Sequence, residues 1–96
     1  MSWEELQTLN QFDSILKNID SDDYFKDMKI DSVVHMLQGA DCQSLIRELH
    51  AYRKNESTPQ SLRNKCRDNM INANFQARIQ NIHTNLCRTE RLPTGR

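Results

Sequence analysis

The scarcity of chain-breaking residues is the feature that most constrains the fold of this sequence. Only two glycines and two prolines occur among 96 residues. Tight β-hairpin turns and phosphate-binding loops both depend on glycine. A β-sandwich, a Rossmann fold and a P-loop enzyme are therefore disfavoured, and we expect an all-α fold.

Apolar residues recur at helical spacing through most of the chain. Ser2 and Glu5 have the spacing of a capping box, and the apolar residues behind it predict a helix from about residue 3 to residue 19: Trp3, Leu6, Leu9, Phe12, Ile15, Leu16 and Ile19. Ser21-Asp22-Asp23 predicts a cap before one short helical turn. Asp31-Ser32 predicts another cap, before a short helix that Gly39 ends.

The second half of the chain predicts the core helix and a long last helix. Asp41 is the expected cap of the core helix, which ends near residue 54 and has one apolar face made of Leu45, Ile46, Leu49 and Tyr52. Thr58 and Pro59 predict the start of the last helix, which continues to about Cys87. We therefore expect one domain over residues 1–87, a compact all-α bundle of four to five short helices, with right-angled packing of armadillo or HEAT type as a variant. Residues 88–96 are predicted to be a flexible tail.

The last predicted helix carries apolar residues on two opposite faces. The first face holds Leu62, Cys66, Met70, Ala73 and Ala77, and the second holds Ile71, Phe75, Ile79, Ile82 and Leu86. Three interpretations stay open: the helix breaks near Asn72, it continues with the first helix covering its second face, or the second face binds a partner. The third makes four residues candidates for partner binding, namely Phe75, Ile79, Ile82 and Leu86. A break is favoured, because asparagine is a poor helix former and a common C-terminal cap. Between cover by the first helix and exposure to a partner, cover is favoured, because monomers seldom expose such a row.

A net charge of zero hides an acidic first half and a basic second half. Up to Asp41, nine acidic residues face three lysines and give −6; from Cys42 onward, ten basic residues face four acidic ones and give +6. Three arginines fall on neighbouring surface positions of the last predicted helix, and two basic residues come just before it. All five are candidates for contacts with an acidic partner or with phosphates: Arg63, Arg67, Arg78, Arg53 and Lys54. The neutral total and the lack of interleaved aromatic residues favour protein over nucleic acid. A simply solvated face is the remaining interpretation.

The cysteines and histidines give no convincing reactive site. Cys42, Cys66 and Cys87 are an odd set at wide spacing, so we expect buried thiols in a reducing compartment. His83 and Cys87 share a helical face, but no second pair completes a zinc site. Cys42 and His35 could in principle form a nucleophilic pair. A catalytic cysteine also needs an oxyanion hole and a cleft, however, and a chain this small and helical rarely builds them. We expect no metal, no cofactor, no small-molecule substrate and no enzyme activity; the absence of a signal and of an apolar span favours a nuclear or cytoplasmic protein without membrane contact.

Four blocks of sequence carry a resemblance to a known family: Val33-Val34-His35-Met36-Leu37, Gly39-Ala40-Asp41, Ile46-Arg47-Glu48-Leu49 leading to Arg53-Lys54, and Lys65-Cys66. They resemble the helical bundle at the N-terminus of the transcription elongation factor TFIIS, which also occurs in elongin A, a Mediator subunit and, as a variant, the integrase-binding domain of LEDGF. The chain lacks the Gly-x-Gly turn and the late tryptophan of that family. The resemblance covers residues 30–75 and implies binding of short disordered motifs in transcription elongation complexes, at loops near residues 19–23 and 55–59. Residues 30–55 are also similar to one armadillo-type repeat.

The sequence therefore predicts a non-enzymatic protein-interaction module that binds short linear motifs or a partner helix, and the resemblance to the TFIIS bundle implies a role in transcription elongation. One alternative is a helical adaptor or subunit of a larger complex. The other is a small nucleic-acid-binding domain that uses the basic residues named above.

Overall fold

The computed structural model describes residues 2–91, and this part of the chain contains helices and turns but no strand. The elements follow in this order: α1 (Trp3–Asp20), a 3-10 turn η1 (Asp23–Phe25), α2 (Lys26–Leu37), α3 (Gln43–Arg53), α4 (Pro59–Asp68) and α5 (Ala73–Arg91). The predicted all-α bundle of four to five helices is confirmed. None of the described helices combines the length and the apolar character that crossing a bilayer requires.

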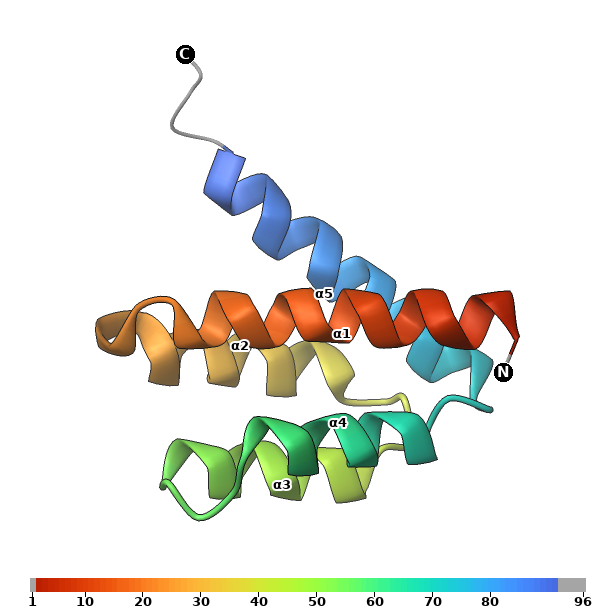
Figure 1. Ribbon diagram of the computed structural model, residues 1–96, viewed down its shortest axis with the longest axis horizontal. Helices are drawn as coiled ribbons and strands as arrows, with labels where there is room; N and C mark the ends of the chain where they lie inside the picture. Colours follow the sequence, from red (N-terminus) through yellow and green to blue (C-terminus); the bar gives the residue numbers. More distant parts are fainter. Residues whose placement is uncertain (1, 92–96) are drawn as a thin grey trace.

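The helices are arranged lengthwise except for the last one. In Figure 1, the axes of α1, α2, α3 and α4 lie roughly parallel to one another, whereas α5 crosses α1 obliquely. α1 packs against α5 and α4, and α3 packs against α4 and α2. The lengthwise course of four helices in this view differs from the right-angled packing that the sequence also suggested.

All five α-helices contribute to a single hydrophobic core. Its fully buried members include Phe12 and Ile15 of α1, Ile30 and Leu37 of α2, Leu45 and Leu49 of α3, Leu62 of α4, and Phe75 and Ile79 of α5. Burying one such side chain is worth about 1.5–3 kcal/mol relative to leaving it in water. The predicted face of α3 is confirmed for Leu45, Leu49 and Tyr52, while Ile46 is only partly buried.

Local capping rules set two of the predicted helix starts. Ser2 and Glu5 form the reciprocal capping box, with the Ser2 hydroxyl accepting from the Glu5 N–H over 3.1 Å. At α4, the Thr58 hydroxyl accepts from the Ser61 N–H over 3.2 Å, and Pro59 occupies the first helical position. Proline is tolerated there because its missing N–H has no partner within the helix.

The cap predicted at Asp31-Ser32 is wrong. α2 begins at Lys26 and passes through Asp31 without a break, because one buried face runs along it: Ile30, Val33, Val34 and Leu37. The predicted stop is confirmed, since α2 ends two residues before Gly39, which adopts φ +88. Glycine takes this left-handed conformation without strain.

The cap predicted at Asp41 is also wrong. Cys42 occupies the N-cap of α3 and makes no capping hydrogen bond from its side chain, while Asp41 has φ +57. Ala40 and Cys42 are both buried in the α2–α3 connection. Their burial holds the intervening Asp41 outward, away from the first turn of α3.

The long last helix breaks near Asn72, which confirms the first of the three interpretations. The Asn72 side chain caps α5 by accepting from the Phe75 N–H over 3.1 Å, and it donates to the Ala40 carbonyl over 3.2 Å. The side-chain amide of Asn74 donates to the Gly39 carbonyl over 2.7 Å. These amides fix the start of α5 against the α2–α3 turn and reset its direction.

The second apolar face of this region belongs to the core except for Ile71, which is 90% exposed in the α4–α5 turn. Phe75, Ile79 and Ile82 are buried, and α5 packs against α1, so the predicted intramolecular cover is confirmed. These three side chains offer no surface to a partner, and their assignment as partner-binding residues is wrong. Leu86 alone of the predicted row is partly exposed.

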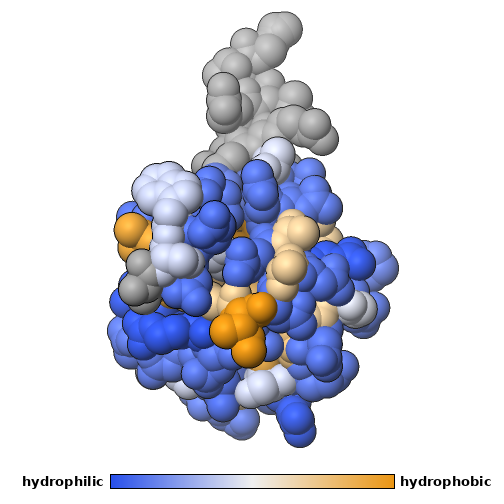
Figure 2. Space-filling model, turned by 90° about the vertical axis from the view of Figure 1, so that its right-hand side faces the viewer, coloured by the Kyte–Doolittle hydropathy of each residue, from blue (hydrophilic) through white to orange (hydrophobic). Residues whose placement is uncertain are grey.

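Both ends of the described chain differ from the predicted pattern. Trp3 and Leu6 are exposed, so the buried face of α1 starts later than its apolar spacing predicted. Figure 2 shows this end of the molecule as a mostly hydrophilic face with separate apolar spots. At the other end, α5 continues to Arg91, so residues 88–91 are helical rather than tail; residues 92–96 lie outside the described residues.

Candidate functional site

The basic residues named from the sequence lie on, or directly after, three different helices. Arg63 and Arg67 lie on α4, Arg78 lies on α5, and Arg53 and Lys54 lie at the end of α3. The break between α4 and α5 separates residues that a continuous helix would have aligned. The predicted arrangement of the three arginines on one helix is therefore wrong.

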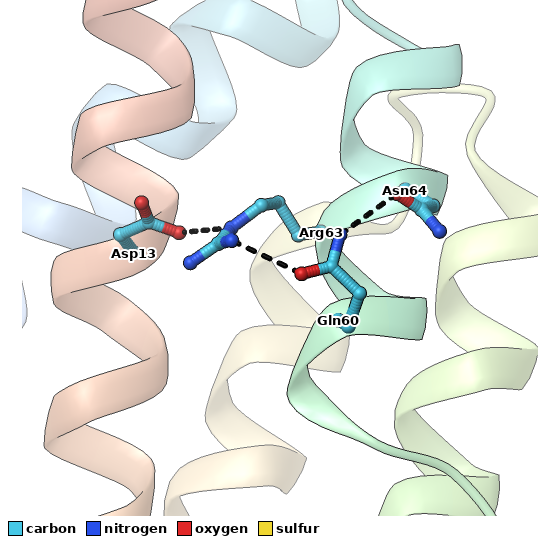
Figure 3. A network of polar contacts seen from close by, with 4 residues as sticks. All are labelled: Asp13, Gln60, Arg63 and Asn64. Atoms are coloured by element: carbon cyan, nitrogen blue, oxygen red, sulfur yellow. Dashed lines mark hydrogen bonds and ion pairs between the residues drawn. The ribbon is translucent and has the colours of Figure 1, made fainter.

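Arg63 is engaged in a polar network that joins α4 to α1 (Figure 3). Its Nε donates to Oδ1 of Asp13 over 2.9 Å, and its Nη1 donates to Oε1 of Gln60 over 3.2 Å. The amide of Gln60 in turn donates to Asn64 over 3.2 Å. Arg63 therefore links α4 to α1, and its charge is paired with that of Asp13.

Arg53 has a similar structural role between α3 and α2. Its guanidinium pairs with Asp31, and its Nε lies 3.9 Å from Oδ1 of Asp27. The pairs of Arg53 and of Arg63 each join an acid of the first half to a base of the second half. Folding therefore offsets part of the charge division seen in the sequence. Lys54 and Arg67 remain exposed.

Arg78, the remaining member of this basic set, is half-buried beside the α2–α3 turn. A Cβ built on Gly39 would lie 3.6 Å from its Nη2. Arg78 thus lies at the α2–α3 turn, whereas Arg63 pairs with Asp13 of α1.

A cleft of about 470 Å³ lies between the second half of α1 and the start of α4. The TFIIS resemblance implied peptide binding at loops near residues 19–23 and 55–59, and Ser21 and Pro59 bring these two loops to the cleft. One of the carboxylates that line the cleft, that of Asp20, accepts a hydrogen bond from the Tyr52 hydroxyl. Burial, and then the Asp20 carboxylate, raise the pKa of Tyr52. Within the cleft, Asp13 and Arg63 pair with each other, whereas Lys17 is exposed.

A second site, which we call the α2–α5 groove, is mainly apolar. It has a volume of about 460 Å³ and is lined by Phe25, Met28, Lys29, Ser32 and Leu86. Phe25 and Met28 are exposed, with 63% of Met28 accessible to solvent. Leu86 supplies the wall from α5, so the one accessible residue of the predicted apolar row lies at this groove.

Tyr24 extends the apolar surface beside the groove. It is 82% exposed, and its ring contacts that of Phe25 with 4.7 Å between the centroids. Asp22 holds the backbone of this turn, since its carboxylate accepts from the Tyr24 N–H over 3.0 Å. Exposed apolar residues that adjoin one another in this way typically mark an interaction site.

Sequence reasoning assigned no role to Tyr24, Phe25 and Met28, which it treated only as a short helical turn. The signal that could have marked Met28 is its position on α2 away from the buried face. Ile30 and Val33 face the core, and two residues of separation place Met28 on nearly the opposite side of the helix from Ile30.

No protein-family model, curated protein or solved structure matches this chain. The resemblance to the TFIIS bundle therefore stays a prediction. The case for a function depends on the surfaces described above.

The described cysteines are buried thiols, as predicted. Cys42 and Cys66 are free, and burial raises the pKa of both, that of Cys66 to about 12. Thiols held in this neutral form are poor nucleophiles. The side chain of Cys87 lies outside the described set. Within that set, no three histidine, cysteine or acidic side chains gather into an arrangement that could hold a metal ion.

Proposed function

We propose that this chain is a non-enzymatic protein-interaction module that binds a short segment of another protein in the α2–α5 groove. One observation carries the proposal: Tyr24, Phe25 and Met28 are exposed side by side at a groove whose far wall is Leu86. Apolar side chains of a partner would replace water on this surface. Each Å² of apolar area buried in this way would stabilise the complex by about 25 cal/mol.

The chemistry of the lining supports binding rather than catalysis. Among the described residues that line the groove, Lys29 carries a charge, and its ammonium donates to the Asn18 carbonyl over 2.8 Å. Ser32 also lines the groove, and none of the described residues beside it there is a histidine or a carboxylate that could act as its base. The residues that meet here suit an apolar anchor.

A role in transcription elongation complexes, and with it a nuclear location, is the narrower form of this proposal. Its support is the set of sequence blocks that resemble the TFIIS bundle, together with the two implied loops that meet at the cleft between α1 and α4. The apolar groove supports peptide binding independently of that resemblance.

A selection from a displayed library of random peptides of about 12 residues tests the proposal. We expect enriched peptides with large apolar residues, and we expect them to lose binding to a Met28→Asp variant. Ile71→Asp is the matched control, because Ile71 is 90% exposed in the α4–α5 turn, outside the residues that line the groove. Peptides that bind both variants equally, or a library that yields no binder, would contradict the proposal.

A further inference from the structure

Acidic side chains surround the exposed apolar residues of η1 and α2. Four exposed aspartates stand before, between and after Tyr24, Phe25 and Met28 in the sequence: Asp22, Asp23, Asp27 and Asp31. The side chains of Asp27 and Asp31 are 70% and 64% accessible even though Arg53 pairs with them. The carboxylates therefore remain available to a partner.

The two lysines of the same stretch are occupied elsewhere in the fold. The Lys26 ammonium lies over the Tyr52 ring, 4.4 Å from its centroid. The Lys29 ammonium is bonded to the Asn18 carbonyl near the end of α1, where the helix dipole favours a positive charge. The stretch thus turns its positive charges toward α1 and α3 and keeps carboxylates at the surface.

Among the described side chains, Arg53 also approaches this region, where it pairs with Asp31 and Asp27. Among the described residues, no ion pair reaches Asp22 or Asp23. These two carboxylates lie directly before and within the turn that presents Tyr24 and Phe25. A negative rim next to an apolar groove is complementary to a partner with the opposite charge.

Building on the proposed function, we propose that the α2–α5 groove binds a basic amphipathic helix of a separate protein. Apolar side chains of that helix, three or four residues apart, enter between Phe25, Met28 and Leu86. Its lysine or arginine side chains flank them and meet Asp22, Asp23 and Asp27. A helix fits better than an extended strand because the site lies between two helices and offers no sheet edge to extend. The acidic rim would also be repelled by an anionic membrane surface, so a membrane is a poorer partner than a basic helix.

Two synthetic peptides of about 14 residues test the partner's charge. Both carry leucine at every third or fourth position, and the remaining positions hold alanine with lysine in one peptide and alanine with glutamate in the other. We expect the lysine peptide to bind the full chain at least tenfold more tightly at about 0.15 M salt by calorimetry, with backbone NMR shifts centred on Phe25, Met28 and Leu86. Equal affinities would overturn the basic partner while leaving the groove as a binding site.

Variants of the acidic rim separate this inference from the proposed function. In Asp23→Asn/Asp27→Asn, we expect the lysine peptide to lose about tenfold in affinity. The double control Glu56→Gln/Asp68→Asn, which neutralises two exposed acids elsewhere, should change it less than twofold. If library peptides bind the groove but the lysine peptide does not, the inference is wrong and the proposed function stands.

Self-association is the outcome that would name a different occupant. If sedimentation shows a dimer of the full chain that Met28→Asp abolishes, a second copy fills the groove and the separate basic helix is overturned. A monomer at the concentrations used for peptide binding is the result we expect.

Discussion

The rings of Tyr24 and Phe25 meet edge to face, with their centroids 4.7 Å apart and their planes at 79°. Such a contact between aromatic rings is worth about 0.5–1.5 kcal/mol beyond the area it buries. Here it orders two side chains that are both exposed, on a turn that Asp22 caps. The apolar surface beside the groove is therefore held in place before any partner binds.

The core assignment of α3 is tested by Leu49→Asp. Leu49 is fully buried, and a carboxylate there has no partner within the core, so we expect a loss of several kcal/mol, a large part of the stability of a domain this size. Urea unfolding measures the loss. Arg47→Ala on the exposed side of the same helix is the control, and a Leu49→Asp variant with an unchanged midpoint would place α3 outside the core.

The burial of the second apolar face is tested by changing Ile79 and Ile82 together to serine. Both side chains pack in the core, so we expect the monomer to lose several kcal/mol of stability through cavities and unpaired hydroxyls. Thermal unfolding of the double variant provides the measurement. An unchanged or more stable and more soluble monomer would mean that this face serves a partner.

The nucleic-acid alternative is tested by titration with generic duplex and single-stranded DNA at about 0.15 M salt. Because Arg63 is bound to Asp13 and Arg53 to Asp31, we expect no saturable complex and no movement of the NMR signals of Arg67 or Arg78. The contradicting result is a saturable complex whose log–log salt slope shrinks by about one in Arg67→Ala.

The acid sensitivity of the α3–α4 connection depends on Glu48. Hydroxyl groups of Ser57 and then Ser61 donate to its carboxylate and lower its pKa. A folded pKa below the unfolded value of about 4.3 stabilises the protein above that pH, and this contribution is lost as the pH falls through the folded value. We expect Glu48→Gln to lower the free energy of unfolding by about 1 kcal/mol at neutral pH.

The pH dependence of that difference is the sharper part of the test. Urea unfolding at several pH values should show the gap between Glu48→Gln and the parent closing below about pH 4. Glu56→Gln, at an exposed position, should track the parent throughout. If the difference in unfolding free energy between Glu48→Gln and the parent stayed constant across the pH range, the charge of the Glu48 carboxylate would have no part in that difference.

The predictions that succeeded depend on interactions close in sequence. The Ser2–Glu5 capping box, the Thr58 cap and the proline at position 59 involve residues within one turn of each other, so they were sufficient to place two helix starts. Asn72 could be identified for the same reason, because asparagine commonly ends or caps helices.

The predictions that failed depend on packing between distant segments. Asp31 and Asp41 are competent caps in isolation, but the continuous buried face of α2 and the burial of Ala40 and Cys42 decide where the chain turns. The engagement of Arg63 by Asp13, fifty positions away, could not be read from local spacing.

The groove could be only half anticipated. Its α5 wall includes Leu86, which the sequence singled out, and Met28 of its α2 wall could have been found from its spacing relative to the buried residues of that helix. Whether Phe25 and Met28 are covered depends on the oblique course of α5 (Figure 1), which follows from the amide contacts of Asn72 and Asn74 with the α2–α3 turn.

Peptide binding by Met28→Asp, measured together with its thermal stability, tests the central claim most directly. Met28 is an exposed groove residue, so the account predicts a melting temperature within a few degrees of the parent and at least a tenfold loss of affinity for peptides selected on the parent chain. A folded Met28→Asp variant that binds those peptides as tightly as the parent would contradict it.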